Sequence, residues 1–201
     1  QYASYGDGGG FAGTNDQCRV SLGLSRIEGS ATSYVGIDVW GYPGCAENPA
    51  TMGGKSYAVI CVSGVLYMWR APGSSTNNLD FQRLYKSTDH GASWSDTGVE
   101  FTFSTHRIGL FGFLQFGKDN QDARDSYVYT YATVFRTYAW GVQTPGEFLL
   151  IRAPKTGLDV ASMYEFYAGK DPQGNPRWGT FAERAAVFTD PNGVMIASAV
   201  Y

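Results

Sequence analysis

Short runs of alternating large apolar and polar residues, separated by glycine-rich turns, dominate the chain and predict β-strands. The clearest pair is Ser56 to Val62 and Val65 to Ala71, with Ser63-Gly64 between them as a tight hairpin turn. Runs at Phe81 to Lys86 and Val99 to Ser104 extend this hairpin. The pattern therefore predicts a unit of four consecutive antiparallel strands.

Similar runs recur on both sides of this unit. They lie at Tyr2 to Tyr5, Cys18 to Leu24, Tyr34 to Trp40, Gly109 to Phe116, Ser126 to Ala132, Glu147 to Ala153 and Met163 to Ala168. A last pair, Ala185 to Phe188 and Val194 to Tyr201, flanks the turn Thr189 to Gly193 and predicts a further hairpin. Repeated four-stranded units joined by variable loops are typical of β-propellers, in which sheets lie radially around an axis.

We therefore predict an all-β protein, a β-propeller of four-stranded antiparallel blades, with residues 1–201 as a single domain. At about 50 to 70 residues a unit, this length holds about three to four blades. The remaining blades would come from a longer chain, truncated here at both ends, or from a partner chain. The alternative fold is a β-sandwich with long loops.

Composition and charge exclude several classes of protein. The net charge is -3 and Lys and Arg form no cluster, which argues against a nucleic-acid partner. No apolar run reaches the roughly 20 residues needed to span a membrane. The three cysteines have no metal-ligand spacing, and we expect no metal and no cofactor. The candidate disulfide joins Cys18 to Cys45, and Cys61 is expected as a buried, unreactive thiol.

The segment Ser87 to Trp94 matches S-x-D-x-G-x-[ST]-W, the Asp-box turn of sialidase-like and other propellers. Asp89 can accept backbone N–H groups across the turn, Gly91 can take a positive φ, and Trp94 can pack beneath the hairpin. We interpret Ser87, Asp89, Gly91 and Trp94 as a structural turn, because turn carboxylates usually satisfy backbone donors.

Three places hold candidate catalytic carboxylates. Asp7 lies in a Gly-rich segment at the end of a predicted strand, where small neighbours admit a ligand; an exposed turn is the competing interpretation. Asp122 and Asp125 flank Arg124 ahead of a strand, and this group fits a site or a fold-stabilising clamp equally well. Glu165 alternates with Tyr164 and Phe166, so it faces a central channel or solvent.

Exposed aromatic residues could stack on the apolar faces of sugar rings, although many of them serve blade packing. The candidates are Trp40, Trp69, Trp140 and Trp178. Trp40, together with Arg124 and Asp122, is the predicted substrate-binding set. A polysaccharide or other glycan is the expected partner, and self-association could complete the propeller.

Several motifs together resemble the domain of unknown function 4185 family, whose characterised members look like endo-D-arabinanases of glycoside hydrolase family 183. The similar segments are Tyr5-Gly6-Asp7-Gly8 with Phe11, Ser21-Leu22-Gly23, Arg26-Ile27-Glu28-Gly29, Gly64 to Trp69, Ser87 to Trp94, Phe116-Gly117-Lys118, Ala123 to Tyr129, and Tyr164-Glu165-Phe166 through Gly169 to Pro176-Arg177-Trp178. The resemblance covers nearly the whole chain, and the order and spacing of the motifs carry it.

The resemblance implies a five-bladed propeller that hydrolyses a furanosidic bond with paired carboxylates, and Asp7 matches one of the family's proposed catalytic aspartates. The other belongs on a strand upstream of Asp7 and has no counterpart in this sequence. We therefore expect a secreted carbohydrate-active protein, a glycoside hydrolase with Asp7, Asp125 and Glu165 as carboxylates to test. The alternative is a non-catalytic propeller that binds glycan or serves an extracellular assembly.

Overall fold

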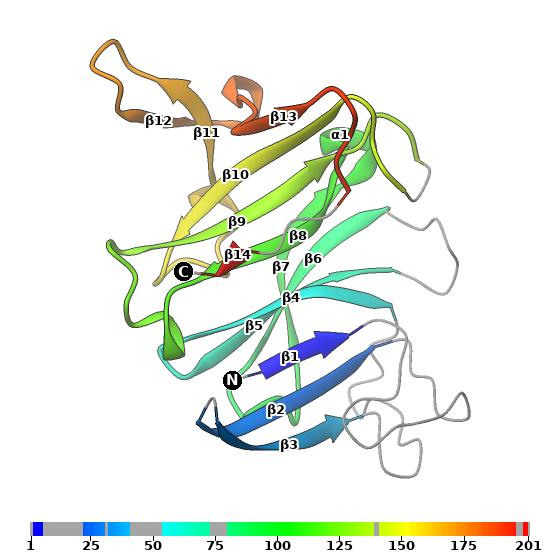
Figure 1. The fold of residues 1–201 in the computed structure, drawn as a ribbon, viewed down its shortest axis with the longest axis vertical. Coiled ribbons are helices and arrows are strands. Elements are labelled where there is room, and N and C mark those ends of the chain that lie inside the picture. Colours follow the sequence, from blue (N-terminus) through cyan, green and yellow to red (C-terminus); the bar gives the residue numbers. More distant parts are fainter. Residues whose placement is uncertain are drawn as a thin grey trace.

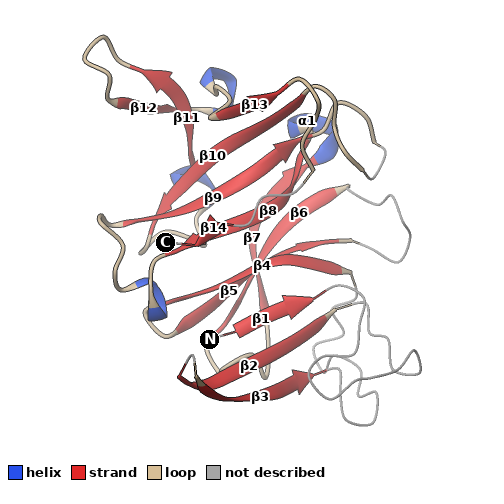
Figure 2. Cartoon of the chain, in the orientation of Figure 1, coloured by secondary structure: helices blue, strands red, loops and turns tan. Residues whose placement is uncertain are grey.

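The computed structural model describes residues 2–5, 22–30, 32–40, 54–72, 80–138, 141–195 and 199–200. The described strands form three sheets that follow one another along the chain (Figures 1 and 2). The all-β prediction is therefore confirmed. Within these ranges, no helix is long and apolar enough to cross a membrane.

The first two sheets are antiparallel and follow chain order. The N-terminal sheet contains β1 (Tyr2–Tyr5), β2 (Gly23–Ser30) and β3 (Ser33–Trp40). The central sheet contains β4 (Lys55–Val62), β5 (Val65–Ala71), β6 (Phe81–Ser87) and β7 (Ser95–Thr102) in the order β4-β5-β6-β7. The predicted four-stranded unit is thus confirmed, and so is its hairpin turn, where Ser63 and Gly64 have φ of 53° and 78°.

The C-terminal sheet is larger and less regular. Its antiparallel strands are β8 (Ile108–Gln115), β9 (Tyr127–Val134), β10 (Gly146–Pro154), β11 (Glu165–Lys170) and β12 (Pro176–Gly179). The short strand β13 (Phe188–Asp190) pairs with β10, and β14 (Ala199–Val200) pairs in parallel with β8.

Two sequence predictions are wrong in detail. The hairpin predicted between Ala185–Phe188 and Val194–Tyr201 is absent from the described residues of this segment, because β13 pairs with β10 and Val194 makes a bridge with Gln143. The strand predicted to reach Ser104 ends at Thr102, and α1 (Phe103–His106) follows. The other helical turns described are η2 (Lys118–Asn120), η3 (Ala161–Met163) and η4 (Phe181–Glu183).

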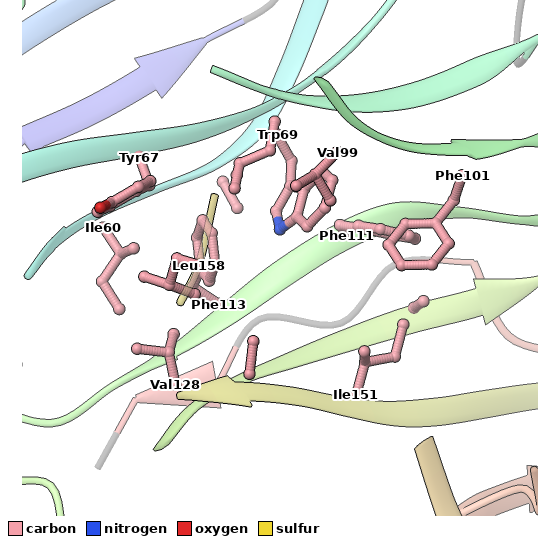
Figure 3. Packing of buried hydrophobic residues seen from close by; sticks show 14 of the residues in the cluster. Ile60, Tyr67, Trp69, Val99, Phe101, Phe111, Phe113, Val128, Ile151 and Leu158 are labelled. Atoms are coloured by element: carbon pink, nitrogen blue, oxygen red, sulfur yellow. The ribbon is translucent and has the colours of Figure 1, made fainter. Parts of the chain in front are cut away.

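The main hydrophobic core lies between the central and C-terminal sheets (Figure 3). Trp69 of β5 is fully buried at its centre, with its ring 4.7 Å from Phe111 and 5.8 Å from Phe101, measured between centroids. Val128 of β9 and Ile151 of β10 contribute to this core from the C-terminal sheet. Burial of these large rings stabilises the packing of the two sheets against each other.

The central sheet is buried on both faces. Met68 alternates with Trp69 along β5, so it points the other way and packs with Leu24 of β2 and with Leu22, which directly precedes β2. The three sheets therefore stack in succession, with the central one in the middle. β4 and β8, the first strands of the central and C-terminal sheets, contact each other.

Candidate functional site

Charged and aromatic side chains gather on the face of the C-terminal sheet that points away from the main core. Val128 of β9 and Ile151 of β10 enter the core, so Tyr127, Tyr129 and Arg152 lie on the opposite face. Strand pairing places Arg152 across from Tyr129 on one side and across from Glu165 on the other. With Asp125 and Trp178, these residues form what we call the aromatic–carboxylate cluster.

Arg152 is the centre of this cluster. Its guanidinium carbon lies 4.0 Å from the ring centroids of both Tyr127 and Trp178. Its Nε and Nη2 each lie 2.8 Å from Glu165 Oε2. The Arg152 side chain is only 16% exposed, whereas that of Glu165 is 41% exposed. The two rings therefore fix the guanidinium plane, which in turn orients a carboxylate that solvent can reach.

Asp125 and Tyr129 form the second half of the cluster. Asp125 Oδ1 accepts the backbone N–H of Tyr127 at 2.9 Å, and Tyr129 Oη donates to Asp125 Oδ2 at 2.6 Å. Burial, and then the hydrogen bond to Asp125, raise the pKa of Tyr129, so its phenol keeps its proton and its role as donor. The Tyr129 ring lies 5.7 Å from that of Trp178, which links the two halves.

The cluster is suited to binding a polyhydroxylated ligand. Half-exposed rings offer apolar surface beside carboxylates that accept hydrogen bonds from hydroxyl groups. Glu165 Oε1 has no hydrogen-bond partner among the described residues, so it is available to such a ligand. A conventional glycosidase needs two carboxyl groups, one on each face of the scissile bond. Here Glu165 already accepts hydrogen bonds from Arg152, and Asp125 accepts them from Tyr129 and from the backbone N–H of Tyr127.

Of the predicted site residues, the structure brings Asp125 and Glu165 to one sheet face. Asp122 and Arg124 lie exposed in the connection between β8 and β9, and the Asp122 carboxylate packs against Gly117. Trp40 ends β3 in a different sheet, and its side chain lies outside the described residues. Asp7 also lies outside them, as do Cys18 and Cys45.

The Asp-box segment connects β6 to β7. Asp89 Oδ1 accepts Ser87 Oγ at 2.8 Å and the Ser93 backbone N–H at 2.9 Å, and Trp94 Nε1 donates to Gly91 O at 3.1 Å. The hydrogen bond from Ser93 Oγ, followed by those from the Ser93 backbone N–H and Ser87 Oγ, lowers the pKa of Asp89 to about 2. Every hydrogen bond that this carboxylate accepts from a described residue comes from its own turn.

Cys61 is a free, half-buried thiol on β4. Burial, followed by the nearby Asp119, raises its pKa to about 11, so the thiol stays protonated near neutral pH. In the described part of the chain, His, Cys, Asp and Glu form no group of three or more that could hold a metal ion.

Sequence reasoning missed the central role of Arg152. The signal was present in the period of two along β9 and β10, which puts Tyr127, Tyr129 and Arg152 on non-core faces. Only the register between β9, β10 and β11 shows that these faces coincide. A scan against models of protein families finds no match, and a search of curated proteins finds no significant match.

Proposed function

We propose that this protein binds a polysaccharide through the aromatic–carboxylate cluster, as a secreted carbohydrate-active protein. The observation that carries the proposal is Arg152, held between Tyr127 and Trp178 while it orients Glu165. Sugar rings present apolar C–H faces to aromatic rings and hydroxyl groups to carboxylates. This cluster contains both aromatic rings and carboxylates. Secretion is part of the proposal, because structural polysaccharides lie outside the cell.

We further propose that the three sheets are blades of a propeller. Face-to-face packing of the central sheet on both neighbours supports this architecture, since a two-layer sandwich leaves one face of each sheet uncovered. The contact between β4 and β8 also supports it, because the first strands of successive blades lie next to each other around the axis.

The resemblance to endo-D-arabinanases favours an arabinan-like furanose polymer as the ligand and its hydrolysis as the reaction. In that proposal Asp7 is the acid or base of the reaction, and Asp125 and Glu165 bind sugar hydroxyls. Release of reducing ends from arabinan by the wild type, and its loss in Asp7→Asn, would support hydrolysis. Undiminished release by Asp7→Asn would remove Asp7 from the mechanism, and no release by the wild type would leave a binding protein.

The binding proposal is tested by calorimetry with arabinan oligosaccharides. Removal of an anchoring aromatic residue costs more than about 1 kcal/mol, so we expect Trp178→Ala to weaken binding roughly tenfold. Tyr34→Ala is the matched control, because Tyr34 is 62% exposed on β3 of another sheet. Circular dichroism would verify that both variants fold. Equal affinities for wild type, Trp178→Ala and Tyr34→Ala would contradict the proposed site.

A further inference from the structure

A depression of about 300 Å³ lies between α1, the end of β9 and the segment after η4. Its lining consists of Thr105, His106, Arg107, Val134, Phe135, Arg136 and Arg184. Three of these seven residues are arginines and none is acidic. The depression lies apart from the aromatic–carboxylate cluster, with which it shares no residue.

Two of the three arginines have no acidic partner among the described residues. Arg107 donates from Nη1 to the carbonyl of Arg136 at 3.4 Å, and Arg184 donates from Nη1 to the carbonyl of Phe181 at 2.8 Å. Arg136 is neutralised, since its Nη2 lies 2.5 Å from Glu147 Oε1. Two arginines that no carboxylate neutralises among the described residues thus line one depression, and an anion placed there would offset their charge.

Local contacts orient the Arg184 guanidinium and fix the backbone from which the Arg107 side chain extends. Arg184 stacks on the Phe181 ring, with its guanidinium carbon 3.7 Å from the centroid. Arg107 caps the C-terminal end of α1 in a left-handed conformation, with φ of 50° and ψ of 40°. Ordered guanidinium groups lose little conformational entropy when they bind, and their planar donors match the oxygens of carboxylate, sulfate or phosphate.

The rest of the lining supplies further recognition but no charge. The half-buried His106 ring lies edge-on to Phe181, at 4.7 Å between centroids, and burial lowers its pKa. It therefore stays largely neutral near pH 7. Thr105 adds a hydroxyl donor, and the half-buried Val134 adds apolar surface. Apolar surface beside two cations suits an anionic group carried on a larger organic molecule better than a bare ion.

We propose that this depression binds an oxyanion, and that the oxyanion is a carboxylate or sulfate ester carried by a sugar. The second part rests on the proposed glycan-binding function, whereas the first part does not. The depression would thus select acidic segments of a polysaccharide, while the aromatic–carboxylate cluster, with two carboxylates and one guanidinium group, binds neutral sugar rings.

The test is calorimetric titration at constant ionic strength with trigalacturonate, its neutral methyl ester, inorganic sulfate and inorganic phosphate. We expect trigalacturonate to bind, and Arg107→Met and Arg184→Met each to weaken that binding roughly tenfold, as loss of a charge-assisted hydrogen bond predicts. Arg177→Met is the matched control, because Arg177 is an exposed arginine of β12 that does not line the depression. Its affinity should equal that of the wild type.

The outcomes separate this inference from the function on which it rests. Equal losses in Arg107→Met and Arg177→Met would overturn the depression as the anion site. Binding of phosphate or sulfate without trigalacturonate would overturn the sugar-borne anion. If Trp178→Ala binds arabinan oligosaccharides as tightly as the wild type while Arg184→Met loses trigalacturonate, the aromatic site fails and the oxyanion site stands.

Discussion

Replacement of Arg152 by Met tests whether the aromatic–carboxylate cluster is a preorganised unit. Met keeps most of the aliphatic stem of Arg152 but removes the guanidinium group that lies over the rings of Tyr127 and Trp178. The variant therefore loses two cation–π contacts and the ion pair with Glu165, while the buried apolar core on the other face of the sheet is unchanged.

The magnitude follows from the geometry. Each cation–π contact at 4.0 Å contributes about 1 kcal/mol at a partly desolvated site. The Glu165 carboxylate is 41% exposed, so solvent screening limits its ion pair to about 0.5 to 1 kcal/mol. We expect Arg152→Met to lower the free energy of unfolding by about 2 to 3 kcal/mol. Arg152→Lys keeps the charge without the planar fork and should lose about half as much.

Urea denaturation followed by tryptophan fluorescence measures this free energy. Arg177→Met removes an exposed arginine outside the cluster and should change it by less than about 0.5 kcal/mol. A double-mutant cycle with Glu165→Gln isolates the ion pair, for which we expect a coupling of about 0.5 to 1 kcal/mol. A loss in Arg152→Met no greater than that in Arg177→Met would refute the idea that Arg152 organises the cluster.

Three further predictions concern the Asp-box turn and the core. The pKa of Asp89 is lowered from 3.8 to about 2, so its stabilising effect is complete above about pH 4 and is lost as the pH falls toward 2. The midpoint of urea denaturation should therefore depend less on pH over this interval in Asp89→Asn than in the wild type. Parallel pH profiles for the two proteins would contradict this prediction. Gly91→Ala should destabilise the fold by about 1 to 3 kcal/mol, because φ of Gly91 is 91° and an added Cβ would lie 2.5 Å from Leu24 Cδ2. Thermal denaturation measures this loss, and an unchanged midpoint would contradict the described packing around Gly91. Trp69→Ala should cost about 3 to 5 kcal/mol in urea denaturation, since its side chain is fully buried, and a loss below about 1 kcal/mol would place Trp69 outside the core.

Local signals were sufficient for the central sheet. Alternation along β4 and β5, with Ser63-Gly64 between them, defines a hairpin whose register depends on neighbours in sequence. The same reasoning failed at Thr189 to Gly193, where the turn residues suggested a hairpin. Phe188 instead stacks on Phe148 of β10, at 6.0 Å between centroids, so a non-local contact decides the pairing.

The candidate site was only partly predictable for the same reason. Asp125 and Glu165 were recognisable as carboxylates beside strands, and alternation placed Glu165 opposite Phe166, which enters the core. Their common face depends on β10, which inserts Arg152 between β9 and β11. No local pattern specifies which strand lies between two others, so the guanidinium bridge could be found only from the sheet register.

The central claim is that a saccharide binds at the aromatic–carboxylate cluster, and the indole N–H signals of the five tryptophans test it most directly. In a two-dimensional ¹⁵N–¹H NMR titration with arabinan oligosaccharides, the Trp178 signal should shift in a saturable manner. Trp69, buried between the sheets, should stay in place as an internal reference. Saturable binding that moves other signals and leaves Trp178 unchanged, or an absence of any shift, would contradict the account.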